Sequence, residues 1–206
     1  MRGALERGLT SLGLALTATQ TEQLLEYLAL FAKWNRAYNL SAIRDVEQML
    51  SKHLLDSLSV AHLISGQRLI DIGTGGGLPG IPLAIAYPDK HLALLDSVGK
   101  KTRFLFQVQQ SLGLSNIEVV HSRVEQYQPS QLYQGVISRA FSSLCNMTSS
   151  CQHLLANDGK FFAMKGLFPE DELSALQKTY RVDAVHPLQV PDLSEQRCLV
   201  VISRER

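Results

Sequence analysis

The stretch LIDIGTGGGLPGIPLA, residues 69–84, constrains the fold more than any other part of the chain. It begins as an apolar run that carries one acidic residue, Asp71, and continues with five glycines in the eight positions 73–80. Glycine accepts positive φ angles and lets a backbone approach a ligand without a Cβ in the way. In an open parallel sheet, ligands bind at the carboxyl ends of the strands. We therefore expect this segment to be a buried strand followed by a ligand-binding loop.

Beyond residue 67 the sequence alternates between short apolar runs and helical patterns. We expect helices over 100–114 and 143–156, and strands over 68–72, 91–96, 117–121, 135–140, 160–166, 180–188 and 197–203. Such alternation favours a mostly parallel sheet that is covered on both faces. The last two strands have no room for a helix between them, so they should form an antiparallel hairpin. The prediction is an α/β fold, the Rossmann-like seven-stranded sheet of class I methyltransferases.

Residues 1–66 read as an N-terminal helical extension, and 67–206 as the ligand-binding domain, the two forming one compact unit. Thr17 with Gln20 is a capping-box pattern, and Asp45 is a plausible N-cap for a third helix that runs to residue 64. The helix between these two caps keeps apolar residues on one face, at Leu24, Leu25, Leu28, Phe31 and Trp34.

Composition narrows the class of partner and the compartment. The net charge is +1, so the chain as a whole has too little positive charge to attract a nucleic acid. A nucleic-acid partner would have to bind to a local patch of basic residues. The three cysteines match neither a zinc site nor a redox pair, and we expect reduced thiols in a cytoplasmic protein without a metal. Glu6 and the polar residues after it argue against a secretory leader, and no run is long enough for a membrane span.

Two cofactors compete for the glycine loop. GGGLPG, residues 75–80, satisfies the G-x-G-x-x-G pattern of nicotinamide dinucleotide sites, but in the register that directly follows the strand Leu78 replaces the third glycine. Asp71 also fits a dinucleotide turn poorly. A carboxylate there can hold the amides of the loop and stand near an ammonium group, which S-adenosylmethionine carries. The D-x-G-x-G-x-G pattern therefore favours S-adenosylmethionine.

Residues that follow the next two strands suit the same cofactor. Asp96 lies about twenty residues beyond the glycine turn, where an acid accepts hydrogen bonds from ribose hydroxyls, although it would serve equally as a helix N-cap. Val124 can pack on an adenine, and Glu125 can accept from its amino group, although an acid at a helix start is common. We expect all three to line the cofactor site.

Two cationic residues lie at the carboxyl ends of the fourth and fifth predicted strands. Arg139 stands in an apolar run and needs a partner, either Asp71 or the carboxylate of the cofactor. Lys165 lies at the equivalent end of the fifth strand. With it, a basic rim could include Lys100, Lys101, Arg103 and Arg123, although scattered solvated charges explain lysines on a helix equally well.

Seven segments taken in order resemble the RsmG family, also called glucose-inhibited division protein B or ribosomal RNA small-subunit methyltransferase G. They are WNRAYNLSAIRD, HLLDSL, LIDIGTGGGLPGIPLAI, LLDSVGKKTRFL, SRVEQ, VISRAFSSL and FFAMKG. The resemblance covers nearly the whole chain and implies S-adenosylmethionine-dependent N7-methylation of a guanine, position 527, in 16S ribosomal RNA. It implies cofactor contacts at Gly73, Leu78, Val124, Glu125 and Arg139, to which the physical argument adds Gly75 and Asp96. Substrate contacts are expected at Asn39, Arg139, Lys165, Lys100 and Arg123.

The implied chemistry needs no general base, because N7 of guanine carries a lone pair and no proton. His62, His121 and His153 stand in unrelated contexts, and His53 with Asp56 is read as a packing pair in preference to a functional one. We expect Asp71, Asp96 and Glu125 not to change charge around pH 7. N7 faces the deep major groove of paired RNA, so the target base should be unpaired or turned out.

The expected partner is 16S ribosomal RNA or the small ribosomal subunit, with neither DNA nor a membrane, and a monomer is favoured. Two alternatives remain open from the residues alone. One is a nicotinamide-dependent oxidoreductase, and the other is an RNA-binding ribosome-assembly factor that binds the cofactor without turnover.

Overall fold

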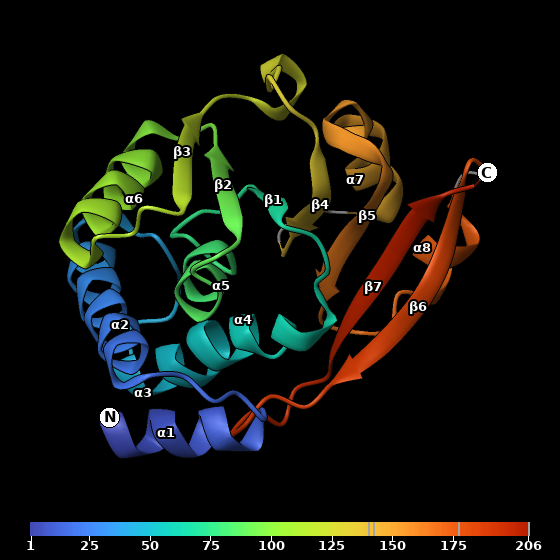
Figure 1. Ribbon diagram of the computed structural model, residues 1–206. Helices are drawn as coiled ribbons and strands as arrows, with labels where there is room; N and C mark the ends of the chain where they lie inside the picture. Colours follow the sequence, from blue (N-terminus) through green and yellow to red (C-terminus); the bar gives the residue numbers. More distant parts are fainter. Residues whose placement is uncertain (140, 142, 177, 206) are drawn as a thin grey trace.

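The computed structural model describes residues 1–139, 141, 143–176 and 178–205, and these form one sheet with helices on both faces (Figure 1). The seven strands follow the order β3-β2-β1-β4-β5-β7-β6. Strands β1 to β5 are parallel, and β7 runs antiparallel to both β5 and β6. The predicted architecture is therefore confirmed. The strands are β1 (Arg68–Ile72), β2 (His91–Asp96), β3 (Ile117–His121), β4 (Tyr133–Ser138), β5 (Leu155–Lys165), β6 (Tyr180–Leu188) and β7 (Arg197–Arg204).

The helices begin close to the predicted capping residues. Thr17 forms a capping box with Gln20, and the Asp45 side chain accepts a hydrogen bond from the Glu47 amide. The α-helices are α1 (Arg2–Ser11), α2 (Ala18–Tyr38), α3 (Val46–Met49), α4 (Asp56–Leu58), α5 (Gly80–Ala86), α6 (Gly99–Leu112), α7 (Leu144–Cys151) and α8 (Glu170–Ser174). A π-helical segment spans Leu50–Leu55, and 3₁₀ turns span Ala61–Leu63, Val124–Gln126 and Gln152–Leu154.

Several predicted boundaries were wrong. The single helix expected over 45–64 is divided into α3, the π-helical segment, α4 and a 3₁₀ turn. A π turn of this kind changes which carbonyls face outward and often marks a functional site. Strand β5 begins at Leu155 rather than residue 160, because Leu155 pairs with Tyr133 ahead of a register shift. Strand β4 ends at Ser138 rather than residue 140, and Ala140 itself lies outside the described residues.

Alternate residues of each strand point to opposite faces of the sheet, and each face has its own apolar cluster. Leu69, Leu94 and Phe162 belong to the cluster that includes α2, α5 and α6. Ile70 and Phe161 belong to the cluster on the α7 face. The first cluster also contains residues of α1 and of the π-helical segment, so the N-terminal helices and the sheet share one core. No described helix is long and apolar enough to cross a membrane.

Helix α2 also braces the glycine loop. The Tyr27 hydroxyl donates to the Gly76 carbonyl at 2.7 Å, and both residues are buried. A Cβ placed on Gly76 would lie 2.3 Å from Cε2 of Phe31. The glycine loop therefore keeps its shape by direct contact with the N-terminal helices.

Candidate cofactor and substrate site

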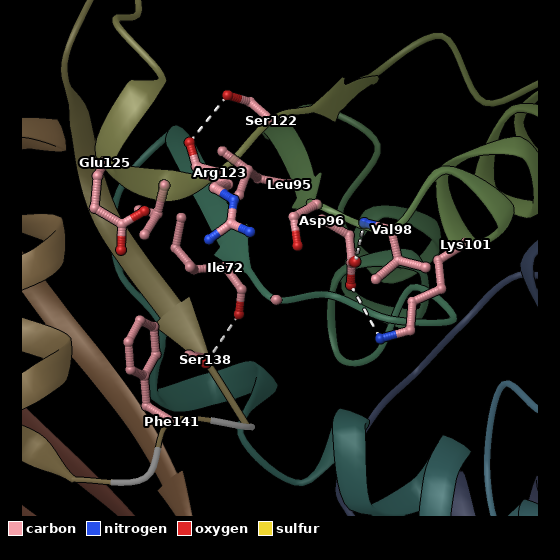
Figure 2. Close-up of a pocket in the computed structure, with 13 residues that line it drawn as sticks. Ile72, Leu95, Asp96, Val98, Lys101, Ser122, Arg123, Glu125, Ser138 and Phe141 are labelled. Carbon is pink, nitrogen blue, oxygen red and sulfur yellow. Dashed lines mark hydrogen bonds and ion pairs between the residues drawn. The ribbon is translucent and has the colours of Figure 1, made fainter.

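A cavity of about 380 Å³ opens at the carboxyl ends of β1 to β4, where the strand order changes direction between β1 and β4 (Figure 2). We call it the strand-end cavity. Gly73 after β1, Asp96 at the end of β2, and Val124 and Glu125 after β3 all line it. Because parallel strands bring their carboxyl ends to one edge, residues far apart in the chain meet here as the sequence predicted.

Asp96 lies at the end of β2 and is not the N-cap of α6, which is Val98, so its predicted ribose contact stays a prediction. Its side chain is buried at the cavity wall, and its oxygens accept from the amides of Gly75 and Val98, both at 2.9 Å. Lys101 approaches the same carboxylate at 3.4 Å. The carboxylate thus ties the glycine loop to the start of α6 while it faces the cavity, and a carboxylate has lone pairs for further donors.

Part of the remaining wall of the strand-end cavity is apolar. Ile72, Leu95 and Phe141 line it together with Val124, and the sequence analysis did not single out these three residues. Ile72 and Leu95 are apolar residues at the ends of β1 and β2, a position that could have identified them. His153, predicted to be structural, contacts the carbonyl of Val124 through Nε2 at 3.1 Å and so supports this wall.

A second cavity of about 210 Å³ lies over the glycine loop and is lined by Gly73, Gly75, Leu78, Lys101 and Arg139, with Phe31, Ser41 and His53 from the N-terminal region. We call it the glycine-loop cavity. It shares Gly73 and Lys101 with the strand-end cavity, so the two are neighbours. A Cβ on Gly73 would meet no atom within 4 Å, and the backbone there has a φ of +66°. The loop is open toward both cavities at this residue.

A third cavity of about 390 Å³ lies beyond Arg139 and His53, which it shares with the glycine-loop cavity. We call it the basic cavity, because four cationic side chains line it and only one carboxylate does. The cations are Lys52, Arg139, Lys165 and Arg197, and the carboxylate is that of Asp56. The three cavities therefore form a continuous row from the β3 side of the sheet to the β7 side.

Asp71 corrects two expectations. It is completely buried and is not among the residues that line the three cavities, so none of these cavities offers a ligand direct access to it. Its Oδ2 accepts from the Thr74 hydroxyl at 2.7 Å and from the Gly80 amide at 2.9 Å, whereas its buried Oδ1 has no partner. Burial raises the pKa of Asp71 to about 7, so the expectation that it keeps its charge around pH 7 was wrong.

The contact between Asp71 and Gly80 also bears on the dinucleotide alternative. Gly80 is the first residue of α5, and its amide already donates to a carboxylate. A dinucleotide would place its pyrophosphate at such a helix N-terminus. The arrangement therefore disfavours a nicotinamide cofactor.

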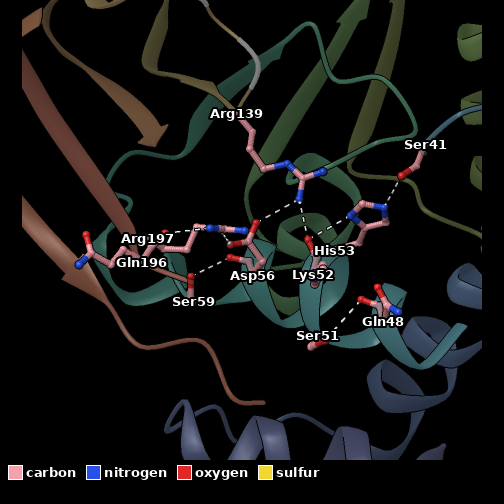
Figure 3. A network of polar contacts seen from close by, with 10 residues as sticks. All are labelled: Ser41, Gln48, Ser51, Lys52, His53, Asp56, Ser59, Arg139, Gln196 and Arg197. Atoms are coloured by element: carbon pink, nitrogen blue, oxygen red, sulfur yellow. Dashed lines mark hydrogen bonds and ion pairs between the residues drawn. The ribbon is translucent and has the colours of Figure 1, made fainter. Parts of the chain in front are cut away.

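Arg139 has a different partner within the protein from Asp71, the one that the sequence predicted. Its Nη1 donates to Oδ2 of Asp56 at 3.1 Å and to the carbonyl of Lys52 at 3.4 Å (Figure 3). The contacts of the described residues include none between Arg139 and Asp71. Arg197 donates from Nε to Oδ1 of the same Asp56 at 3.1 Å. The sequence analysis missed Arg197, although a cation at the start of a buried strand was a usable signal.

His53 and Asp56 face the same cavity without pairing with each other in the described contacts. His53 Nε2 contacts the Ser41 hydroxyl at 2.7 Å, and its ring packs against that of Phe31. Burial, reinforced by the charge of Arg139, lowers the pKa of His53 to about 4. The imidazole is therefore neutral at physiological pH.

The predicted basic rim is only partly assembled. Lys101 and Arg123 line the strand-end cavity, and Lys165 lines the basic cavity, where it pairs with Glu172 at 2.8 Å. Three further predicted residues, Asn39, Lys100 and Arg103, are exposed and are not among those that line the three cavities. The Asn39 side chain instead accepts a hydrogen bond from Arg44 at the end of α2.

Comparisons with known proteins find relatives over nearly the whole chain. A family model described as rRNA small subunit methyltransferase G matches residues 20–201. A protein named ribosomal RNA small subunit methyltransferase G from Saccharophagus degradans is 58% identical over 193 residues, which cover 94% of this chain and 86% of the relative. A protein of the same name from Pseudomonas fluorescens is 54% identical over 200 residues, which cover 97% of this chain and 94% of the relative.

Solved structures share the fold at low sequence identity. An S-adenosylmethionine-dependent methyltransferase from Aquifex aeolicus is 17% identical with a TM-score of 0.56, covering 75% of this chain and 92% of that chain. The M. jannaschii TYW2 structure, in complex with AdoMet, is 13% identical with a TM-score of 0.57. The match covers 74% of this chain and 76% of that chain. At these identities the likeness concerns the fold alone.

Proposed function

The chain belongs to the rRNA small subunit methyltransferase G family, and from that membership we propose that it transfers a methyl group from S-adenosylmethionine to N7 of a guanine, position 527, in 16S ribosomal RNA. The observation that carries the proposal is the row of three cavities, in which a cofactor-sized cleft at the strand ends continues into a basic cavity. Such a row has room for a methyl donor and a polyanionic acceptor on either side of Arg139.

The residues at the first two cavities fit an adenosyl cofactor. An adenine would lie in the strand-end cavity on the apolar wall near Val124 with Glu125 at its edge, and Asp96 would accept from the ribose. The amino-acid end would extend over Gly73 and Gly75, whose positive φ angles let the backbone come close. Leu78 lines this part together with two cations, Lys101 and Arg139, and the carboxylate of the cofactor would lie near them.

When bound, S-adenosylmethionine supplies an electrophilic methyl group on a positively charged sulfur. Because N7 of guanine has a free lone pair in the ring plane and no proton, the protein need not remove one. Its residues act by alignment and by electrostatics, through the glycine loop and Arg139. His53 is neutral and is bonded to Ser41, which agrees with a packing role rather than that of a base.

The basic cavity is the proposed entrance for the RNA. The whole chain has a net charge of only +1, yet four cations meet at this one place. Lys165 and Arg139 are the predicted substrate residues that lie there, and Arg123 lines the opposite cavity. The target guanine would enter unpaired or turned out of its helix. We propose that the protein is cytoplasmic, because its proposed substrate is 16S ribosomal RNA or the small ribosomal subunit, and that it is a monomer.

Methyl transfer from radiolabelled S-adenosylmethionine tests the proposal directly. Small-subunit particles and naked 16S ribosomal RNA, each prepared without the methyl group, are incubated with the protein and the modified base is mapped. Label at N7 of a single guanine is the expected result, and particles that already carry the methyl group are the control. Label on another atom would contradict the proposed target.

A thermal-shift experiment separates the two alternatives. A ligand that binds only the native state raises the melting temperature, so S-adenosylmethionine should do so and NAD should not. A shift with NAD alone would support an oxidoreductase. A shift with S-adenosylmethionine but no methyl incorporation would support an RNA-binding assembly factor.

A further inference from the structure

The four cations of the basic cavity are not equally neutralised. Lys165 has its own carboxylate, Glu172, at 2.8 Å, and Lys52 has its own, Glu195, at 2.8 Å. Each of these lysines therefore forms a one-to-one ion pair at the edge of the cavity. The two arginines do not.

Arg139 and Arg197 share the single carboxylate of Asp56, with one oxygen for each guanidinium at 3.1 Å (Figure 3). Asp56 is 2% exposed, whereas the side chains of Arg139 and Arg197 are 26% and 25% exposed. Two positive charges against one negative charge leave one positive charge in excess, and the excess faces the cavity. The cofactor would not remove this excess, because its one carboxylate comes with an ammonium and a sulfonium group. A partly buried charge without a counter-ion is costly, so this arrangement favours an anionic ligand.

The arginines also retain donors for such a ligand. Arg139 uses Nη1 for Asp56 and the Lys52 carbonyl, and Arg197 uses Nε for Asp56 and Nη1 for the Gln196 carbonyl. Among the contacts of the described residues, none involves Nη2 of either arginine. Guanidinium groups bind phosphate oxygens through such a free edge, often with two parallel hydrogen bonds.

We propose that the basic cavity binds one phosphodiester group of the substrate RNA between Arg139 and Arg197, and that Asp56 is the positioning residue that holds the two guanidinium groups side by side. This inference rests on the proposed function. A neutral base in the same place would leave the excess charge uncompensated, so the backbone of the RNA is the better occupant. Since Arg139 also borders the glycine-loop cavity, the bound phosphate lies close to the proposed site of methyl transfer.

The test is a double-mutant cycle between Arg197 and single phosphates of the RNA. Small-subunit RNA fragments that contain the modified guanine each carry one neutral methylphosphonate linkage, at successive positions. At one position the neutral linkage should weaken binding to the unaltered protein by about tenfold, the loss expected for a charge-assisted hydrogen bond. The same linkage should cost little in Arg197→Gln, because its partner is already gone.

Arg181→Gln is the matched control, since it removes the same charge from β6 at a residue that pairs with Asp183 and lines none of the three cavities. It should keep the full tenfold loss at the sensitive linkage. The salt dependence gives an independent reading. The slope of log affinity against log salt should fall by about 0.7 in Arg197→Gln, as for one phosphate contact on single-stranded RNA, and stay unchanged in Arg181→Gln.

Asp56→Asn separates positioning from general electrostatics. The substitution makes the cavity more positive, so simple attraction predicts tighter RNA binding, whereas loss of positioning predicts weaker binding and no sensitivity to the methylphosphonate. Glu195→Gln also removes one negative charge, at the edge of the basic cavity, and should keep the sensitivity of RNA binding to the methylphosphonate. Circular dichroism and S-adenosylmethionine binding show whether each variant is folded. If Asp56→Asn does not fold, the cycle with Arg197→Gln still decides the phosphate site.

The outcomes separate this inference from the proposed function. If the unaltered protein methylates the RNA but no linkage is coupled to Arg197, the phosphate site is wrong and the function stands. If no methyl transfer to RNA occurs, the function itself is wrong. Tighter binding by Asp56→Asn with the sensitivity retained would overturn the positioning role of Asp56.

Discussion

Replacing Asp71 by asparagine should change how the stability of the protein depends on pH. Burial raises the pKa of this carboxyl to about 7 in the folded chain, against about 3.9 in an unfolded chain. Its contribution to stability is therefore fully present below about pH 4 and is lost as the pH rises through 7. About three pKa units at about 1.4 kcal/mol each give a total loss of about 4 kcal/mol, of which about 2–3 kcal/mol falls between pH 5 and 8.

Asparagine has nearly the same shape and no charge at any pH. Its carboxamide oxygen can take the place of Oδ2, which accepts from Thr74 and Gly80, and its amino group then occupies the position of the unpartnered Oδ1. That amino group is itself left without a partner, a cost that does not vary with pH. The pH dependence is therefore the informative quantity, rather than the stability at one pH.

Urea unfolding of both proteins at pH 5, 6, 7 and 8 measures this quantity. The free energy of unfolding of Asp71→Asn relative to the unaltered protein should rise by about 2–3 kcal/mol from pH 5 to pH 8. Asp158→Asn, the same substitution at an exposed residue, should show no such trend. A difference that stays constant over this range, or that falls with pH, would refute the reasoning from burial.

Three further predictions address the site. Asp96→Ala should weaken S-adenosylmethionine binding by about 1–3 kcal/mol in calorimetry, and an unchanged affinity in a folded variant would remove its ribose role. Gly76→Ala should lower stability by about 1–3 kcal/mol because its Cβ would lie 2.3 Å from Phe31. Adding Phe31→Leu should restore part of the loss, and a single variant as stable as the unaltered protein would contradict the clash. The single-turnover rate of Asp71→Asn at saturating substrates should be nearly independent of pH from about pH 6.5 to 8.5. Adding His53→Gln should leave the rate equally independent of pH. A tenfold rise in the rate per pH unit would require a titrating base.

Local patterns were enough to predict the architecture and half of the site. Thr17 and Asp45 could be assigned as caps because capping depends on residues a few positions away. Asp96 and Val124 could be placed together because each follows a strand, and parallel strands bring their carboxyl ends to one edge. The membership of the RsmG family could likewise be inferred, since it depends on motifs and their order.

Tertiary structure decided which charges meet and which are buried. Arg139 was read as a partner for Asp71, but the fold brings Asp56 and Arg197 to it from the N-terminal helices and the last strand. Asp71 was expected to stay charged, but burial raises its pKa to about 7, although the Gly80 amide of α5 donates to it and opposes the rise. Ion pairing and desolvation depend on every group within a few ångströms, whatever its distance along the chain. The sequence by itself therefore determined the succession of strands and helices and the place of the glycine loop, and only the packed structure determined the partners and the protonation of the charged residues around that loop.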